Sequence, residues 1–314
     1  MGLVGIARRQ VGCAGAGNLA NAVLIGMGFK PEEVKAWSPG VHSGRRKTNY
    51  LIAENNAAAA AFAKRYYMIT SKPAQVGGVC DEVAPVFQAQ KPEERPLVLI
   101  FAAGIRMQFV NKKLPEGTPT AIVVANTAAK VRESMFIVLF NEYVTKEQRA
   151  MLITDLSLVG KVEVFSNERL MNLLMYFAGS GPAINYFTDE VMIELMVEEG
   201  VPRESAEIIW EQVKVGSGKL YEESGLPRKT LRENITSEGG ITHEAISSLM
   251  LGSFKAELRA AMKAAVRRAD SIGEEAETAE INPKAPRKNG LFPEYDNDPT
   301  GIEGLDPNFI RPQK

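Results

Sequence analysis

The first half of the chain alternates short apolar runs with helical patterns. Continuous apolar runs predict strands at Val11–Ala14, Val34–Trp37, 66–71, 97–101, 120–125, 135–140 and 162–165. Runs of this kind are typical of parallel strands that are covered on both faces. Apolar residues at helical spacing predict helices between them, as at 18–25, 55–63, 77–90 and 145–158, with Pro85 near a break in the third. The alternation predicts an α/β domain with a doubly covered sheet.

The texture of the sequence changes at Asn167, where strand signals stop. Long helical patterns follow at 183–199, 205–223 and 244–272, interrupted by glycine-containing segments. We therefore predict an α/β domain over 1–166 and an all-α domain over 167–272. Residues 273–314 are rich in proline and acidic residues without periodicity, which predicts a disordered or extended tail.

A glycine-rich turn joins the first predicted strand to the first helix. Gly15, Gly17 and Ala20 form the pattern Gly-x-Gly-x-x-Ala. Gly15 permits the turn, Gly17 lets a pyrophosphate approach the backbone, and Ala20 allows close packing of helix on strand. The N–H groups of a first helical turn also attract anions. The pattern predicts a Rossmann dinucleotide site; the alternative is a glycine-rich turn of another α/β protein.

The end of the second predicted strand indicates which dinucleotide binds. An acidic residue there would bind the ribose 2′-hydroxyl of NAD. This chain has Ser38, followed by Arg45 and Arg46. These groups suit a 2′-phosphate, because arginine offers paired donors to phosphate oxygens. The sequence favours NADPH over NADH, although NADH stays possible; the alternative is that the arginines belong to a solvated helix start.

The overall composition narrows the functional classes. Of 314 residues, 45% are hydrophobic and 24% charged, and the formal net charge is −1. Nothing in this balance favours nucleic acid or an anionic membrane as a partner. Cys13 and Cys80 as the only cysteines indicate a reducing compartment, so we expect a cytoplasmic protein. With His42 and His243 as the only histidines, we expect no metal site.

Several motifs, in order over about residues 10–272, resemble those of the pyrroline-5-carboxylate reductase family. Its members reduce a cyclic imine with NAD(P)H to form proline. The two most specific motifs are Gly179-Ser180-Gly181-Pro182-Ala183 and Thr236-Ser237-Glu238-Gly239-Gly240-Ile241-Thr242. The others are the Gly15 turn, Ser38-Pro39 followed by Arg45-Arg46, Ser71-Lys72-Pro73, Ala102-Ala103-Gly104 and Asn126-Thr127.

The resemblance implies an architecture and a set of site residues. Family members pair a Rossmann domain with a helical domain that interleaves with a partner subunit, so we expect a homo-oligomer with its active site at the subunit interface. The implied cofactor-binding residues are Gly15, Ala16, Gly17, Asn18 and Leu19 at the pyrophosphate, Ser38, Pro39, Arg45 and Arg46 at the adenosine phosphate, Asn56 at the ribose, Thr70, Ser71, Lys72, Pro73, Ala102, Ala103 and Gly104 at the nicotinamide side, and Asn126 and Asn234. The implied substrate-binding residues are Glu168, Ser237, Glu238, Gly239, Gly240, Ile241 and Thr242.

Thr242 is the predicted catalytic residue. The resemblance places its hydroxyl at the imine nitrogen, where a hydroxyl can donate or accept as iminium becomes amine. It also implies that backbone N–H groups of Gly239, Gly240 and Ile241 bind the substrate carboxylate. The alternative for Thr242 is the N-cap of the last helix, since threonine is common there; one side chain can do both.

The chain departs from the family pattern near its most specific motifs. Glu238 replaces a usual proline, Ile184 a ring, Asn172 an aspartate and Ala178 a serine. These departures motivate two alternatives, a reductase of another cyclic imine and a cofactor-binding paralogue without turnover. Hydroxyacid dehydrogenases of similar build are less favoured, because they carry a catalytic lysine shortly after their second glycine motif, and here the first lysine after that motif is Lys214.

Overall fold

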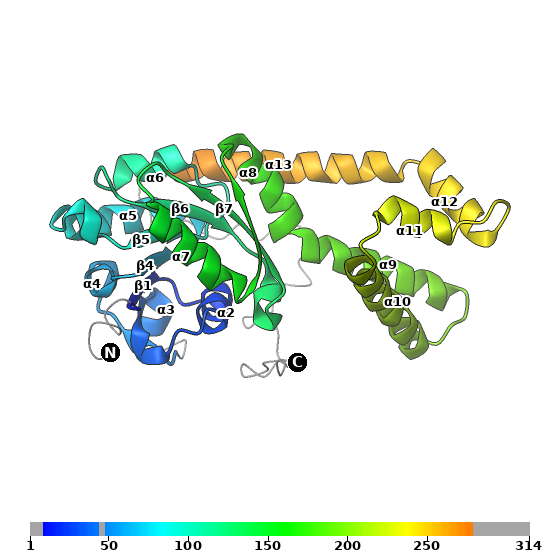
Figure 1. Ribbon diagram of the computed structural model, residues 1–314, viewed down its shortest axis with the longest axis horizontal. Helices are drawn as coiled ribbons and strands as arrows, with labels where there is room; N and C mark the ends of the chain where they lie inside the picture. Colours follow the sequence, from blue (N-terminus) through cyan, green and yellow to red (C-terminus); the bar gives the residue numbers. More distant parts are fainter. Residues whose placement is uncertain (1–8, 44–47, 279–314) are drawn as a thin grey trace. The chain divides into compact units, whose positions relative to one another are not determined.

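The computed structural model describes residues 9–43 and 48–278. The chain divides into two compact units, Met1–Gly179 with Arg267–Lys314, and Ser180–Val266. Within the described residues the first unit contains one eight-stranded sheet in the order β3-β2-β1-β4-β5-β6-β7-β8 (Figure 1). All neighbouring strands are parallel except β6 and β7, which are antiparallel. The predicted Rossmann-type α/β domain is confirmed.

The strands lie where the apolar runs predict them, with small shifts at their ends. Their bounds are β1 Val11–Ala14, β2 Val34–Trp37, β3 Leu51–Ile52, β4 Tyr66–Ile69, β5 Leu97–Ile100, β6 Thr120–Val124, β7 Ser134–Phe140 and β8 Gly160–Phe165. The two-residue strand β3 was not predicted, because both of its side chains are exposed and no longer apolar run marks it.

Helices cover both faces of this sheet. In β4, Tyr66 packs in one buried cluster with residues of α2 (Asn18–Gly26) and α7 (Lys146–Ser157). Tyr67 packs in the other with residues of α4 (Asn56–Phe62), α5 (Pro73–Gln88) and α6 (Met107–Lys113). Adjacent strand residues point to opposite faces, so two fully buried tyrosines serve two cores. The α-helices of this unit are α2 Asn18–Gly26, α3 Pro39–His42, α4 Asn56–Phe62, α5 Pro73–Gln88, α6 Met107–Lys113, α7 Lys146–Ser157 and α8 Met171–Leu174.

The third predicted helix differs from expectation. The 77–90 pattern is part of α5, which starts at Pro73 and contains Pro85 without a break. Pro85 lies in the last turns and is exposed, as is Asp81 four residues earlier. Pro85 has no N–H to donate to the Asp81 carbonyl, so the helix lacks one backbone hydrogen bond there. Both residues lie on the exposed side of the helix, and the helix continues through Pro85 to Gln88.

The second unit is helical. It contains α9 Gly181–Glu198, α10 Arg203–Ser224, α11 Arg228–Asn234, α12 Ile241–Leu251 and the first part of α13 Phe254–Thr278. Asp189 on α9 accepts hydrogen bonds from Trp210 Nε1 over 2.8 Å and from Lys214 Nζ, both on α10. This polar contact joins two helices that otherwise expose many apolar side chains.

Two predictions about the C-terminal helices are wrong. The single helix at 244–272 is two helices, because the chain leaves helical geometry at Gly252, which is extended with φ −80° and ψ −169°. The last helix also continues to Thr278 instead of ending at Ile272. It continues because Gly273 and Ala276 are buried within the first unit, to which these last turns belong, through contacts that the local pattern does not reveal. The rest of the predicted tail lies outside the described residues.

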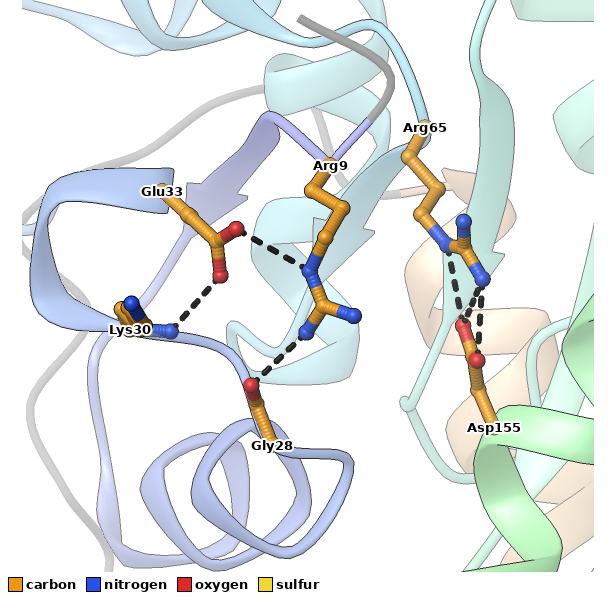
Figure 2. Close-up of polar contacts among 6 residues, drawn as sticks. All are labelled: Arg9, Gly28, Lys30, Glu33, Arg65 and Asp155. Atoms are coloured by element: carbon orange, nitrogen blue, oxygen red, sulfur yellow. Dashed lines mark hydrogen bonds and ion pairs between the residues drawn. The ribbon is translucent and has the colours of Figure 1, made fainter. Parts of the chain in front are cut away.

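Ion pairs and hydrogen bonds link the segments at the amino ends of the strands. Arg9 donates to Glu33 over 3.0 Å and to the Gly28 carbonyl over 2.7 Å (Figure 2). Arg65, just before β4, donates through Nε and Nη2 to both carboxylate oxygens of Asp155 on α7 (Figure 2). These contacts lie at the amino ends of the strands, whereas the glycine-rich turn follows the carboxyl end of β1. They therefore stabilise the sheet at the end away from that turn.

Candidate active site

The glycine-rich turn has the geometry of an anion site. Gly15 has φ +103°, and its N–H donates to the Trp37 carbonyl over 2.8 Å. A Cβ on Gly15 would lie 2.6 Å from Thr70 Oγ1, so only glycine fits. Gly17 caps α2 without a side-chain hydrogen bond, and the first turn of α2 has no acidic residue. No side chain among the described residues caps this turn, so its N–H groups can serve an anion.

The sheet topology brings the other predicted cofactor residues to the same edge. β1 lies between β2 and β4, and the chain crosses from one side of β1 to the other between β3 and β4. Ligands bind at the carboxyl ends of strands at such a switch point. Ser38 follows β2, Thr70 follows β4, and the turn of residues 102–104 follows β5. Asn126 follows β6 at this edge.

The polar side chains that follow β2 and β3 differ in the hydrogen bonds that they make within the protein. Ser38 Oγ accepts the Val41 N–H over 3.3 Å as cap of α3, which leaves its own proton to donate. Arg45 and Arg46 lie outside the described residues. Asn56, predicted at the ribose, is buried and donates to Glu82 over 2.9 Å. Its neighbour Asn55 is exposed and caps α4.

The segment after β4 contains a buried hydroxyl without a partner. Thr70 N donates to the Ala14 carbonyl over 2.9 Å, and Thr70 Oγ1 to the same carbonyl over 3.3 Å. Ser71 Oγ is buried and makes no hydrogen bond among the described residues. Lys72 is exposed as the cap of α5, and Pro73 is its first residue. An unpaired buried hydroxyl is costly unless an ordered water or a ligand supplies its partner.

Cys13 lies directly beneath the glycine-rich turn. Its thiol donates to the Gly15 carbonyl over 2.7 Å and lies 3.9 Å from Thr70 Oγ1. Burial raises the pKa of this thiol to about 12. The thiol therefore stays neutral and supports the turn as a hydrogen-bond donor.

Asn126 and Glu168 stabilise the backbone around this edge. Asn126 Oδ1 accepts the Ala128 N–H over 3.1 Å, and its Nδ2 donates to the Ala178 carbonyl over 2.9 Å. Glu168 Oε1 accepts the N–H of Met107, the first residue of α6. Sequence reasoning placed Glu168 at the substrate pocket and did not reveal this helix cap, which joins segments far apart in sequence.

The Thr236–Thr242 motif forms a turn and a helix start in the second unit. Gly239 has φ +72°, and Gly240 N donates to the Ser237 carbonyl over 3.0 Å. Gly240 is the N-cap of α12 and supplies no side chain to the helix. Thr242 is half-buried in the first turn of α12, so its alternative role as N-cap is wrong. As at α2, a glycine cap leaves first-turn N–H groups for an anion.

The remaining predicted residues of the second unit are placed on exposed backbone. Asn234 ends α11, and Glu238 lies in the turn before α12 with an exposed side chain. Ile241 is 92% exposed. The two units thus carry separate parts of the predicted site, a nucleotide edge in one and the Thr242 turn in the other.

Comparison with known proteins shows which enzymes this chain is similar to. The description "Pyrroline-5-carboxylate reductase dimerisation" matches residues 168–272. Pyrroline-5-carboxylate reductase of Synechocystis is 29% identical over 274 residues, which cover 84% of this chain and 98% of the relative. The enzyme of Pseudomonas aeruginosa is 27% identical over 85% of this chain and 97% of its own. The chain is therefore similar to pyrroline-5-carboxylate reductases over most of its length, and its helical segment matches their dimerisation domain.

Solved structures of this family agree in fold. The pyrroline-5-carboxylate reductase of Coxiella burnetii has a TM-score of 0.73 at 26% identity, over 84% of this chain and 98% of that one. The Plasmodium falciparum pyrroline carboxylate reductase, solved with NADP bound, has a TM-score of 0.74 at 24% identity, over 84% of this chain and 98% of that one. Across residues 9–43 and 48–278, no helix is both long and apolar enough to span a bilayer.

The family departures lie at positions with visible local consequences. Asn172 donates to Asp270 on α13 over 2.6 Å, a neutral donor where a second aspartate would repel the first. Ala178 is buried in the π-helical turn Met175–Gly179. Ile184 is half-buried on α9, and nothing in the structure explains its replacement of a ring.

Proposed function

We propose that this chain reduces 1-pyrroline-5-carboxylate to L-proline with NADPH, the last step of proline biosynthesis. The observation that carries the proposal is the pair of glycine-capped helices, α2 at the sheet's switch point and α12 within the segment that matches the family. Each presents N–H groups without a side-chain cap, one suited to a pyrophosphate and one to a carboxylate. The two relatives named above are pyrroline-5-carboxylate reductases.

The residues at the sheet edge fit an NADP cofactor. Gly15 and Gly17 allow a pyrophosphate to reach the α2 backbone, and the unpartnered Ser71 hydroxyl gains a partner from a bound ligand. The Ser38 hydroxyl, which accepts the Val41 N–H, still has its own O–H to donate to an adenosine phosphate. Arg45 and Arg46 are proposed to pair with the charge of that phosphate. The 102–104 turn and Asn126 complete the nicotinamide side. Asn56 stays the proposed ribose contact: its Nδ2 donates to Glu82, while its buried Oδ1 has no hydrogen-bond partner among the described residues.

The start of α12 is assigned to the substrate. Backbone N–H groups of Gly240 and its neighbours hold the substrate carboxylate, aided by the helix dipole. Thr242 is the second residue of the helix, and there its hydroxyl oxygen accepts a hydrogen bond from the N–H of the iminium. After reduction the same hydroxyl donates to, or accepts from, the amine. Thr242 thereby orients the ring and holds a proton at nitrogen throughout.

The chemistry places modest demands on these residues. A bound nicotinamide supplies a hydride to the imine carbon, and the electron pair of the C=N bond passes to the already protonated nitrogen. The chain contributes orientation, which is a proximity effect, and a fixed hydrogen bond at nitrogen. Cys13 and Cys80 are free thiols, which supports a reducing cytoplasmic location.

We further propose a homo-oligomer assembled through the helical domain, 167–272, which follows the dinucleotide domain 1–166. The family description that matches is a dimerisation domain. Exposed apolar side chains on the second unit support this assignment, since large apolar patches mark interfaces; among them are Tyr186, Phe187, Ile208, Ile235, Met250 and Leu251. Light scattering at assay concentration tests it, and an active monomer would contradict it.

A single assay tests the proposed activity. NADPH oxidation is followed with 1-pyrroline-5-carboxylate, and with six-membered cyclic imino acids as competitors. We expect the highest kcat/KM with the five-membered substrate and L-proline as product. Preference for another ring would favour the broader imine reductase, and NADPH binding without oxidation would favour a cofactor-binding paralogue.

A further inference from the structure

The C-terminal turns of α13 cross the 102–104 turn with no side chain between the two backbones. A Cβ on Gly104 would lie 2.4 Å from the Ala269 carbonyl oxygen and 3.0 Å from Gly273 N. A Cβ on Gly273 would lie 2.4 Å from the Gly104 carbonyl oxygen. A Cβ on either glycine would therefore clash with the backbone of the other segment. Gly104 also has φ +73°. Both glycines are therefore required for this separation of helix and turn.

Polar contacts hold the crossing from both sides. Arg106, two residues after Gly104, lies 3.8 Å from Glu274 and 3.5 Å from Glu277 of α13. One turn earlier on α13, Asp270 accepts from Asn172. Ala276 is buried in the same apolar cluster as Ala102 and Ile105. The last turns of α13 thus pack directly against the 102–104 turn.

We infer that Gly273 is a positioning residue for the cofactor: the last turns of α13 set the 102–104 turn at the nicotinamide side. The inference rests on the proposed function. It separates two parts of the dinucleotide site, because the pyrophosphate end is built by Gly15, Gly17 and α2, whose backbone hydrogen bonds among the described residues do not involve α13. Disturbing the crossing therefore affects the nicotinamide end alone.

The test compares two ligands on Gly273→Ala. One is NADPH, and the other is 2′-phospho-ADP-ribose, which has the same adenosine and pyrophosphate groups without nicotinamide. We expect titration calorimetry to show weaker NADPH binding but fragment affinity within about twofold of the parent. We expect kcat to fall about tenfold or more, because small misplacements at a reacting centre are costly. Alanine favours the helix over glycine, so helix propensity does not explain a loss.

Matched variants control for general damage. Gly218→Ala makes the same change on α10, where a Cβ would meet nothing within 4 Å, and should bind both ligands as the parent does. The double variant Glu274→Gln, Glu277→Gln removes both ion pairs of Arg106 and adds no bulk. If Gly273→Ala does not fold, the same two ligands are compared on this double variant. Glu275→Gln is its control, because Glu275 pairs with Arg268 of its own helix.

Each outcome bears on the inference. Equal loss of NADPH and fragment, or unchanged NADPH binding and kcat in both α13 variants, would overturn it while leaving the reductase activity in place. Failure of the parent to bind NADPH would overturn the proposed function, and the inference with it. Selective loss of NADPH with retained fragment binding supports it.

Discussion

The Tyr66 hydroxyl donates a hydrogen bond over 2.7 Å to Asp155 Oδ2, the same carboxylate oxygen to which Arg65 Nε and Nη2 donate. The aspartate is largely buried, and α7 is held to the start of β4 through it. Asp155→Ala should lower the free energy of unfolding by about 3–5 kcal/mol, because it leaves a guanidinium unpaired. Tyr66→Phe should cost about 1 kcal/mol, since the ion pair remains.

Urea unfolding measures both effects. The control is Lys113→Ala, which removes the solvent-exposed pair with Asp81 and should change stability by at most about 1 kcal/mol. If Asp155→Ala costs no more than Lys113→Ala, the buried pair does not anchor α7.

Thr242 should be the most sensitive side chain for turnover. Because Gly240 and not Thr242 caps α12, Thr242→Ala leaves the helix start intact and tests chemistry alone. Loss of a hydrogen bond at the changing charge should lower kcat about 10²–10³-fold. Thr242→Ser should recover most of it, and Ser248→Ala, the same deletion further along α12, should have little effect. A fully active Thr242→Ala would remove the threonine from the mechanism.

Arg45 and Arg46 should set the preference for NADPH. Replacing both with alanine should raise KM for NADPH far more than KM for NADH, because only NADPH carries the 2′-phosphate. Ser38→Ala is a poorer test, since it also removes the cap of α3. Steady-state kinetics with each cofactor measures the ratio, and Lys91→Ala serves as an exposed cationic control. Equal effects on both cofactors would contradict the assignment.

Glu238 should have a modest influence on substrate affinity. Its side chain is exposed beside the α12 start, so its charge is largely screened by water. Glu238→Gln and Glu238→Pro should therefore leave the preferred imine unchanged and alter KM only slightly. A fall in KM for 1-pyrroline-5-carboxylate beyond about tenfold in both variants would show that the charge faces the pocket. The natural substrate would then be expected to carry an extra positive group.

Cys13 should contribute to loss of stability at alkaline pH. Burial raises its pKa from 9.0 to about 12, so the folded chain keeps this proton at pH values where the unfolded chain loses it. Stability from this group is present below pH 9.0 and is lost as the pH rises towards about 12. Burial and the adjacent Asp155 carboxylate also raise the pKa of Tyr66, which adds to the loss from its ordinary value of 10.0 upwards.

Unfolding measured from neutral to alkaline pH checks this prediction. Cys13→Ala should make the decline of stability above about pH 9 shallower, and the native thiol should resist aromatic disulfide reagents until the chain unfolds. Cys80→Ala should have a comparable effect on the slope, because burial raises its pKa to about 12 as well. An unchanged slope in Cys13→Ala would refute the shift.

Much of the first unit was predictable because its signals are local. Apolar runs such as Val11–Ala14 and Leu97–Ile100 predict buried parallel strands, and the Gly15–Gly17 spacing predicts the turn that β1 and α2 form. Thr145, predicted as the first residue of its helix, instead caps α7 in a capping box with Gln148. Each of these features depends on residues within a few positions of one another, so the sequence alone determined them closely.

Other features were decided only when distant segments met. Gly273 looks like a poor helix residue, yet it is buried because its backbone crosses Gly104. Asn56, expected near a ribose, is buried and donates to Glu82 on α5, a partner that the local sequence does not indicate. Glu168 caps a helix that begins at Met107. No local pattern encodes such pairings, because they depend on how the sheet orders its strands and brings remote backbones within hydrogen-bonding distance.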